Sequence, residues 1–401
     1  MKPQYFPLVL VAFFLSWGLQ TKANPELKHA VDTVIDQAIQ NKKLVGTVIL
    51  VARDGNIIYE RAAGFKDREA KTVLQTNSIF RYASMTKSIV SMAALHLVDR
   101  GIITLDDPVS KWIPDFKPVL LDRSEPTITI RQLLTHTSGL TYSFFEPPNG
   151  PYHQLGVSDG LDNKGITLTE NIRRLGQAPL VSAPGTKWNY SLSIDVLGEV
   201  LAQAAKKPLP DIVKETVTEP LKMTDANFLV TDPSRLTVPY AAKSPEPERM
   251  TDPYRVYIGA NYIEFSPGRA LDPTAFPSGG AGMMGTSHDY FKFLEAIRTG
   301  STGLKPETAL LMTTNQIGDL PIDAEGYGFT FGFSYLKNPE QARSPAKVGT
   351  LDWGGAYGHN FWLDPQAKLV VVILTNTASL DLATFTSDVK AAIYSSIPGV
   401  K

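Results

Sequence analysis

Phe80-Arg-Tyr-Ala-Ser-Met-Thr-Lys87 leads into a helix that we predict over 84–100. The residues after Lys87 are apolar on nearly every side of this helix, and Gly101 follows at a position typical of a helix end. A helix of this composition belongs in the interior of a fold. Ser84 and Lys87 stand three positions apart, so they share one helix face and the lysine amine can reach the serine hydroxyl.

A serine at the start of a buried helix is a candidate nucleophile. Backbone N–H groups and the positive end of the helix dipole lie close to Ser84 and favour developing negative charge. Lys87 would be desolvated one turn into the helix, which favours a neutral amine able to accept the serine proton. The alternative is an N-cap serine beside a lysine whose amine extends to solvent.

Ser-x-x-Lys alone is a weak signal, and its context decides among the copies. Three others occur, at Ser334/Lys337 in a strand-like run, at Ser344/Lys347 in a Pro-containing loop and at Ser387/Lys390. The last pair lies in an amphipathic terminal helix, where a solvated lysine is expected.

Composition excludes several classes of protein. The 401 residues contain no cysteine, so disulfide scaffolds and thiol or Cys-metal chemistry are excluded. Lys and Arg number 39 against 40 Asp and Glu, without long like-charge runs, which argues against a nucleic-acid partner. The six histidines show no ligand spacing, so no metal site and no cofactor is predicted.

Residues 1–23 have the pattern of a signal peptide. Lys2 precedes an apolar run from Phe6 to Leu19, and Thr21-Lys22-Ala23 forms a small-x-small cleavage site. The run falls short of a comfortable membrane span, although an uncleaved anchor helix is the alternative. Because of this pattern, we expect an exported protein, either periplasmic or secreted. No later stretch is long and apolar enough to span a bilayer, so we expect no membrane partner after cleavage.

The hydrophobic pattern predicts an α+β fold. Apolar spacing indicates a helix near 27–39, a hairpin over 46–51 and 57–59, and further strands at 327–335, 353–358 and 368–375. Helices are expected at 128–134, 193–205, 209–218, 287–298 and 381–395. Strand signals are scarce from 105 to 285, where 244–253 and 266–280 have the Pro content of surface loops or a lid. We therefore expect an antiparallel sheet flanked by helices, completed by both chain ends, plus a mostly helical inserted region.

Two other motif matches lack their structural context. Gly280-Ala-Gly-Met-Met-Gly285 matches a dinucleotide-binding pattern, but no apolar strand leads into it. Gly156-Val-Ser-Asp-Gly160 matches a nucleophile elbow, yet it lies in a polar loop. We expect neither to be functional.

Five stretches in one order carry a family resemblance. They are Phe80–Lys87, Leu105-Asp-Asp-Pro-Val-Ser-Lys111, Gln132-Leu-Leu-Thr-His-Thr-Ser-Gly-Leu140, Pro184-Gly-Thr-Lys-Trp-Asn-Tyr-Ser191 and Gly279-Gly-Ala-Gly-Met-Met-Gly-Thr-Ser287. Together they resemble the serine β-lactamase and penicillin-recognising enzyme superfamily, on its class C and esterase side. The resemblance implies a β-lactamase/transpeptidase-like fold over 24–401, with an α/β part at about 24–83 and 286–401 and a mostly helical part at about 84–285.

The resemblance also implies roles for single residues. Ser84 matches the nucleophile, Lys87 its helix-mate base, and Tyr190 the tyrosine that relays the proton to the leaving group. The backbone N–H groups of Ser84 and Ala356 would form the oxyanion hole. His136 in His-Thr-Ser-Gly is interpreted as part of a turn at a helix end rather than as a member of a triad.

Two departures from the lactamase pattern indicate the substrate. Trp353-Gly354-Gly355 stands where Lys-Thr-Gly or His-Thr-Gly is usual, and Leu192 replaces the Asn of Tyr-x-Asn. Trp353 and Leu192 favour an apolar acyl or alcohol group, and this combination resembles the family VIII carboxylesterases. A structural alternative makes Trp353 an aromatic core residue beside a bulge.

The expected activity is hydrolysis of a small-molecule, short-chain acyl ester through an acyl-enzyme on Ser84. A class C-like β-lactamase or D-amino-acid peptidase is the alternative, so the substrate could be a β-lactam. An acyltransferase differs only in the nucleophile that receives the acyl group. A penicillin-sensing receptor agrees less well with the sequence, because we expect no transmembrane helix to carry a signal. An inactive scaffold agrees less well because Ser84, Lys87 and Tyr190 are all present.

Overall fold

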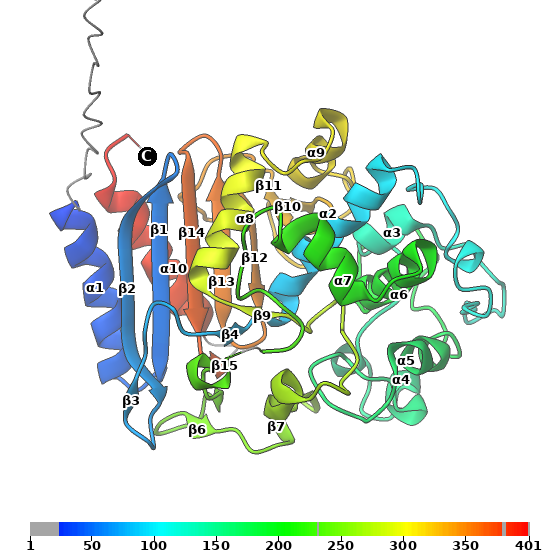
Figure 1. Cartoon of the computed structure of the whole chain (residues 1–401), viewed down its shortest axis with the longest axis horizontal. Helices are drawn as coiled ribbons and strands as arrows, with labels where there is room; N and C mark the ends of the chain where they lie inside the picture. Colours follow the sequence, from blue (N-terminus) through cyan, green and yellow to red (C-terminus); the bar gives the residue numbers. More distant parts are fainter. Residues whose placement is uncertain (1–23, 231, 379–381, 400–401) are drawn as a thin grey trace, which may run out of the picture.

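An eight-stranded antiparallel sheet forms one half of the computed structural model, which describes residues 24–230, 232–378 and 382–399 (Figure 1). The strands are β1 (Gly46–Arg53), β2 (Asn56–Asp67), β3 (Thr72–Val73), β10 (Tyr327–Phe329), β11 (Ser334–Leu336), β12 (Leu351–Gly355), β13 (His359–Asp364) and β14 (Leu369–Thr375). Their order is β10-β11-β12-β13-β14-β1-β2-β3, so β1 pairs with β14. This arrangement confirms the predicted α+β fold and the contribution of both chain ends to one sheet.

Strand β14 is buried on both faces, which explains its unbroken apolar sequence. Val370, Val372 and Leu374 point into one hydrophobic core. Leu369, Val371 and Ile373 point into a second core on the opposite face. Because side chains alternate along a strand, a central strand covered on both sides must be apolar at every position.

Helices cover both faces of the sheet (Figure 1). α1 (Pro25–Gln40) and α10 (Leu382–Ser396) pack together on one face, and α8 (Ser287–Thr299) contacts β14 and β1 from the other. α1 begins where the Asn24 side chain accepts from the amides of Glu26 and Leu27, as expected of an N-cap. α9 (Pro306–Thr313) lies near α2.

The other half of the molecule holds the remaining helices, with α2 between them and the sheet (Figure 1). They are α2 (Thr86–Asp99), α3 (Ile130–Leu134), α4 (Pro151–Leu155), α5 (Leu168–Leu175), α6 (Ser193–Ala205) and α7 (Leu209–Val213), the last continued by a π turn at Lys214–Thr218. Short 3₁₀ turns occur at Ala83–Met85, Val109–Lys111, Ser143–Phe145, Pro233–Arg235 and Pro267–Leu271. Twelve of the fourteen residues of α2 are buried, which confirms the predicted interior helix.

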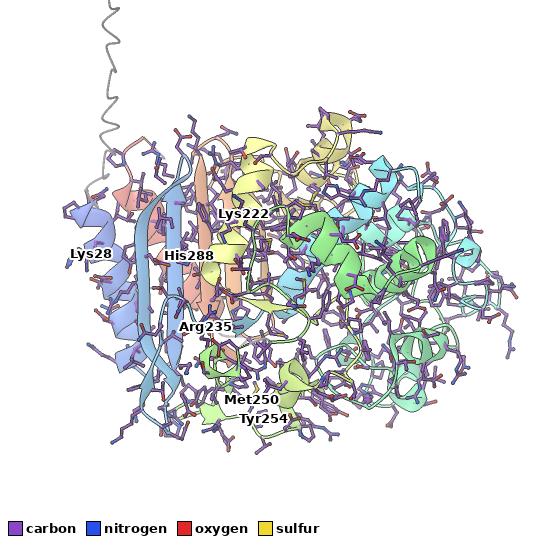
Figure 2. The ribbon with its side chains drawn as sticks, viewed as in Figure 1. Lys28, Lys222, Arg235, Met250, Tyr254 and His288 are labelled. Atoms are coloured by element: carbon purple, nitrogen blue, oxygen red, sulfur yellow. The ribbon has the colours of Figure 1, made fainter. Side chains whose placement is uncertain are left out.

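The expectation of few strands between 105 and 285 is wrong for part of that region. β7 (Tyr254–Ile258) and β8 (Asn261–Phe265) form a hairpin, and short pairings involve β4 (Phe80–Arg81), β5 (Tyr240–Ala241), β6 (Glu248–Arg249), β9 (Met284–Gly285) and β15 (Thr377–Ala378). Met250, Tyr254 and Phe265 belong to a small core that anchors the hairpin to Tyr357. Met250 and Tyr254 lie at one edge of the molecule (Figure 2). The hairpin was missed because the Pro-rich segments on both sides of it resemble loops.

Two predictions for the C-terminal strands also need correction. The expected strand at 327–335 is two strands, β10 and β11, paired as a hairpin. β13 was not predicted, although it pairs with both β12 and β14. The predicted signal peptide at 1–23 lies outside the described residues. Among the helices that the structure describes, none is long and apolar enough to cross a membrane.

Candidate active site

Ser84 lies in the tight turn Ala83–Met85 that leads directly into α2. Ala83 has φ of 49°, in the left-handed region that costs a non-glycine residue about 1 kcal/mol. The turn is held by β4 pairing with β9 and by the Tyr82 hydroxyl, which donates to the Thr286 carbonyl at 2.6 Å. The serine therefore sits where the sequence places it, at the start of a buried helix.

Lys87 is turned toward Ser84 and is almost completely buried. Its side chain belongs to a residue only 2% exposed, and Nζ lies 3.3 Å from Ser84 Oγ. The same Nζ donates to the Gly280 carbonyl at 2.8 Å. A Cβ at Gly280 would collide with the buried Asp195 carboxylate, so the chain packs closely against α6 at this glycine. The Ser-x-x-Lys pair thus has a geometry that permits proton transfer.

Tyr190 forms the other side of the lysine environment. Lys87 Nζ lies 4.7 Å from the centre of the Tyr190 ring and 5.4 Å from that of Tyr142. The Tyr190 hydroxyl is buried and has no hydrogen-bond partner among the described residues. A buried phenol without a protein partner is available to a reacting group. The structure therefore brings Ser84, Lys87 and Tyr190 together, although they come from two distant segments.

His136 packs against Tyr190, and a ring nitrogen faces the Ser191 hydroxyl. It follows α3 at a turn with φ of 55°, and its Nδ1 lies 3.1 Å from the Ser191 hydroxyl. Its ring lies 5.0 Å from that of Tyr190. Burial, and then the charge of Lys87, lower the pKa of His136 well below its usual range, so the ring is neutral. These contacts agree with the predicted structural role.

Strand β12 forms the wall opposite α2. Trp353 lies among three aromatic rings, with centroid distances of 5.2 Å to Tyr190, 5.5 Å to Phe329 and 6.5 Å to Trp188. It is only partly buried and also lines the cavity that contains Ser84. Trp353 therefore packs on an aromatic core and also presents a face to the cavity, and its contact with a substrate stays a prediction.

Close packing between β12 and the turn of Ser84 requires a glycine. A Cβ at Gly355 would lie closer to the Tyr82 carbonyl oxygen than real Cβ atoms approach. Ala356 follows Gly355 directly and lines the same cavity as Ser84. The backbone amides assigned to the oxyanion hole thus come from two segments in close contact.

His359, which the sequence analysis did not select, connects β13 to the strand before Ser84. Its Nε2 lies 2.7 Å from the Arg81 carbonyl, and its Nδ1 accepts from the Thr375 amide at 3.1 Å. Nδ1 must be unprotonated to accept, so Nε2 donates and the ring is neutral. Burial lowers the pKa of His359 to about 4, which agrees with this assignment. Buried histidines give no sequence signal beyond their position in a strand.

The cavity above Ser84 has a volume of about 590 Å³. Its apolar lining comes from the turn at 143–145, from the β7–β8 hairpin and from β12. The lining side chains that sequence reasoning missed include Tyr142, Phe144, Phe145, Leu161, Ile258 and Ile263. Gly354 and Gly355, which were predicted, also line it. The β-branched and aromatic residues of Tyr254–Phe265, interrupted by a glycine at 259, were an available signal for the hairpin wall.

The prediction that Leu192 contacts the substrate is wrong in this structure. Leu192 is 0% exposed and packs in the main hydrophobic core at the start of α6. Its amide donates to the Thr141 carbonyl at 3.3 Å. Residue 192 follows Tyr190 by two positions, but the chain enters the helix there and turns this side chain inward.

Two carboxyl groups, those of Asp159 and Asp352, line the cavity, and burial shifts the pKa of the first. Asp159 accepts from the Ser143 amide at 3.1 Å and from the Ser143 hydroxyl. Burial raises the pKa of Asp159 to about 7. The carboxyl is therefore largely neutral below that pH and becomes charged above it.

The other motifs behave differently from Ser84/Lys87. Ser158 is fully buried and bonded to Asp162 in the loop before α5, which confirms that it is no nucleophile elbow. The expectation of a solvated Lys390 is wrong, because its side chain is 13% exposed and Nζ lies 3.4 Å from Asp352. In the part of the chain that the structure describes, no group of three or more His, Asp or Glu side chains is arranged to hold a metal.

The sheet, the interior helix and the Ser-x-x-Lys pair at its start together define a serine enzyme of the penicillin-recognising fold class. The chain belongs to the Beta-lactamase family, whose sequence profile matches residues 31–392. It is 45% identical over 357 residues to Esterase EstB of Burkholderia gladioli, covering 88% of this chain and 91% of that protein.

Solved structures of similar fold include a hydrolase and a synthase. The structure of EstCE1, a hydrolase with promiscuous acyltransferase activity, superposes with a TM-score of 0.87 at 40% identity and covers 93% of this chain and 99% of that one. Unliganded simvastatin synthase from Aspergillus terreus shares the fold, with a TM-score of 0.71 at 22% identity over 93% of this chain and 99% of that one.

Proposed function

We propose that the protein is a serine carboxylesterase that cleaves short-chain acyl esters through an acyl-enzyme on Ser84. The observation that carries this proposal is the 3.3 Å approach of the buried Lys87 Nζ to Ser84 Oγ at the floor of an apolar cavity. A nucleophile and a base in hydrogen-bond reach are the signature of covalent catalysis. The similarity to Esterase EstB supports the same activity.

The reaction is a two-step acyl transfer. Ser84 Oγ attacks the ester carbonyl carbon while the Lys87/Tyr190 pair takes its proton. The tetrahedral intermediate then collapses, the bond to the alcohol oxygen breaks, and Tyr190 returns the proton to that oxygen. Water next attacks the acyl carbon while the same pair takes the proton of the water. The bond to Ser84 Oγ then breaks, the pair returns that proton to Oγ, and the carboxylic acid is released.

The amides of Ser84 and Ala356 are proposed to stabilise the negative carbonyl oxygen. The close approach of Gly355 to Tyr82 supports this assignment, because it fixes the two segments relative to one another. Removal of one such donor typically lowers kcat by roughly 10²- to 10³-fold. The position of the Ala356 amide relative to Ser84 therefore affects the rate of the proposed reaction.

An uncharged ester fits the walls of the cavity better than a lactam or an acyl amino acid. Among the described residues that line it, none is a lysine or arginine able to pair with a substrate carboxylate. Trp353, Phe144 and Ile263 instead offer apolar surface. We therefore assign short acyl chains to this cavity.

Hydrolysis of p-nitrophenyl butyrate by the wild type and by Ser84→Ala tests the function. We expect Ser84→Ala to abolish turnover and phosphonate labelling without loss of folded structure, whereas Ser301→Ala, at an exposed serine after α8, keeps full activity. Substantial turnover by Ser84→Ala would refute the assignment. A nitrocefin kcat/KM that exceeds the ester value by orders of magnitude would instead establish the lactamase alternative.

Acyl transfer to an alcohol is a second candidate, because EstCE1 is described as a hydrolase with promiscuous acyltransferase activity. The acyl-enzyme is common to both reactions, and only the incoming nucleophile differs. Adding an alcohol during ester hydrolysis separates the two, since a transferase forms a new ester at the expense of free acid.

We also propose that residues 1–23 direct export and are then removed. The basic start, the short apolar run and the small-x-small site support this proposal. N-terminal sequencing of the protein from a periplasmic or secreted fraction should begin at Asn24. A chain that starts at Met1 in the purified protein would contradict it.

A further inference from the structure

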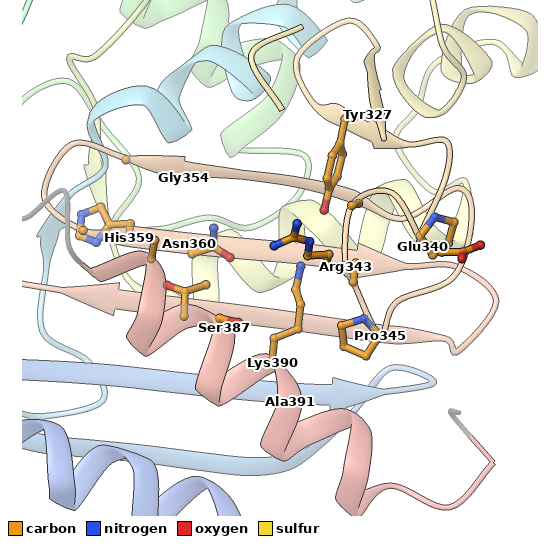
Figure 3. Close-up of a pocket in the computed structure, with 17 residues that line it drawn as sticks. Tyr327, Glu340, Arg343, Pro345, Gly354, His359, Asn360, Ser387, Lys390 and Ala391 are labelled. Carbon is orange, nitrogen blue, oxygen red and sulfur yellow. The ribbon is translucent and has the colours of Figure 1, made fainter. Parts of the chain in front are cut away.

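The β7–β8 hairpin forms a wall of the catalytic cavity without being part of a larger sheet. Among the described residues, its two strands pair only with each other, whereas β12, which forms another wall, is paired along both edges. Gly354 of β12 lies beside Asn360 of β13, and α10, which carries Lys390, lies over these strands across a cavity of about 1000 Å³ (Figure 3). An isolated two-stranded hairpin is only marginally stable in water. The position of the hairpin wall therefore depends on its side-chain contacts.

One face of the hairpin has an apolar base, a cavity wall above it and a polar residue at the tip. At the base, Tyr254 pairs with Phe265, and both belong to the small core described above. Ile263, two residues before Phe265, lines the catalytic cavity. Ile258 also lines it and pairs in register with Asn261, next to the turn of the hairpin. Directly paired residues of antiparallel strands point to the same side, so Asn261 lies on the face that carries the cavity wall.

Asn261 joins the tip of the hairpin to the turn at 143–145 and to the residue that follows this turn. Its Nδ2 donates to the Phe144 carbonyl at 3.4 Å and to the Glu146 carbonyl. Two carbonyl oxygens require a donor, so the amide nitrogen belongs on this side. The Asn261 Oδ1 is buried without a hydrogen-bond partner among the described residues. The side-chain amide is therefore held through its donor end.

The turn that accepts these hydrogen bonds is itself attached to the body of the protein. The Ser143 amide donates to Asp159 Oδ1 at 3.1 Å, and the Ser143 hydroxyl donates to the same carboxyl group. Phe144 and Phe145 of this turn line the catalytic cavity. Asn261 therefore connects the hairpin wall, which no larger sheet supports, to a wall that has its own attachment.

We propose that Asn261 is a positioning residue that limits the length of the acyl chain accepted by the catalytic cavity. This inference rests on the proposed esterase function. The cavity, of about 590 Å³, has to hold both the acyl part and the alcohol part of an ester. The hydrogen bonds of Asn261 hold the wall that contains Ile258 at a fixed distance from the wall that contains Phe144. A long acyl chain needs these walls to separate, and binding only to a minor, open arrangement lowers the apparent affinity by the population of that arrangement.

Asn261→Asp tests this role without changing the size of the side chain. An ionised aspartate has no donor, so its oxygens would face the two carbonyl oxygens without a hydrogen bond. Asn56→Asp is the matched control, because Asn56 is also the first residue of the second strand of a hairpin, β1–β2. It is exposed, and its Nδ2 donates to the Asp54 carbonyl at 3.1 Å. Asn261→Gln keeps the donor amide on a longer side chain.

The first measurement compares p-nitrophenyl octanoate with p-nitrophenyl butyrate. We expect the octanoate-to-butyrate ratio of kcat/KM to rise roughly 5- to 30-fold in Asn261→Asp, the factor expected when one or two hydrogen bonds no longer hold the closed arrangement. The kcat for butyrate should stay near the wild-type value, because Ser84 and Lys87 are unchanged. Asn261→Gln should lie between the wild type and Asn261→Asp, and Asn56→Asp should match the wild type. An unchanged ratio in folded Asn261→Asp, or an equal rise in Asn56→Asp, overturns the proposal.

Hydrogen exchange of the amides of residues 254–265 tests the position of the hairpin independently of activity. These amides should exchange faster in Asn261→Asp than in the wild type, and at the wild-type rate in Asn56→Asp. Unchanged exchange in Asn261→Asp overturns the positioning role. If the wild type hydrolyses neither ester, the proposed function fails and the limit on acyl chains fails with it, whereas the exchange rates still show whether Asn261 holds the hairpin.

Discussion

Gly355→Ala tests whether the contact between β12 and the turn of Ser84 positions the catalytic amides. The new Cβ would meet the Tyr82 carbonyl oxygen more than half an ångström inside the 3.0 Å limit of real Cβ contacts. Gly355 does not have a positive φ, so alanine is compatible with its backbone conformation and the effect is steric. The atom it meets is backbone, which cannot rotate away as a side chain can. We therefore expect β12 and the turn to separate.

The size of the effect follows from that displacement. A misplacement of about 1 Å can lower the rate roughly 100-fold. If the logarithm of the rate loss scales with the displacement, a shift of about 0.5 Å lowers the rate about tenfold, or by about 1.4 kcal/mol of transition-state stabilisation. We expect kcat/KM for p-nitrophenyl butyrate to fall at least by this factor, mainly through kcat. The rate of Ser84 phosphonylation should fall in parallel, because its transition state uses the same amides.

A matched control separates this effect from a general cost of alanine. Gly176→Ala at the end of α5 places its Cβ no closer than 3.2 Å to the Phe116 side chain, and φ there is −66°. This variant should keep wild-type kinetics, and circular dichroism should show both variants folded. A folded Gly355→Ala enzyme with unchanged kcat and phosphonylation rate would refute the positional role of this contact.

Two further predictions concern pH. Since burial raises the pKa of Asp159 to about 7, kcat/KM for an anionic ester such as p-nitrophenyl hemisuccinate should fall relative to p-nitrophenyl butyrate as the pH rises through 7. Asp159→Asn should remove this difference, and a pH-independent ratio in the wild type would contradict it. His359 has a pKa of about 4 when folded, against about 6.5 in an unfolded chain, so the unfolded state binds more protons between these values. Its contribution to the free energy of unfolding, about 3 kcal/mol, is therefore complete above pH ~6.5 and lost as the pH falls to ~4. Urea unfolding at both ends of this range should show a larger loss for the wild type than for His359→Gln, and equal losses would contradict the neutral buried ring.

The elements that the sequence predicted well are those whose pattern is local. α2 has twelve buried residues among its fourteen, and β14 is apolar at six of its seven positions, because both elements are covered on all sides. This property is visible in consecutive residues of the sequence. The Ser84/Lys87 pair was also accessible, since helical spacing alone brings the two side chains to one face. Its partner Tyr190 was accessible only through the family resemblance, because no local pattern distinguishes it among 15 tyrosines.

The elements that were missed depend on tertiary packing. The Lys390 amine was expected in solvent because its helix is amphipathic. In the structure it instead forms an ion pair with the carboxylate of Asp352 on β12 and is mostly buried. Leu192 was assigned to the substrate because of its distance from Tyr190 in sequence, although the start of α6 buries it. Neither the position of β12 behind α10 nor the turn into α6 can be deduced from the spacing of residues along the chain.

Trp353 connects the catalytic geometry with the choice of substrate. Its ring packs on Tyr190, Trp188 and Phe329, so the residue that replaces a cation also supports the ring of the proposed proton relay. A lysine at this position would place an ammonium in that aromatic cluster, where burial disfavours the charged form. The exchange of a cation for an aromatic ring is therefore coupled to the rest of the site. The proposed preference for an apolar ester substrate therefore depends on the packing around Tyr190 as well as on the lining of the cavity.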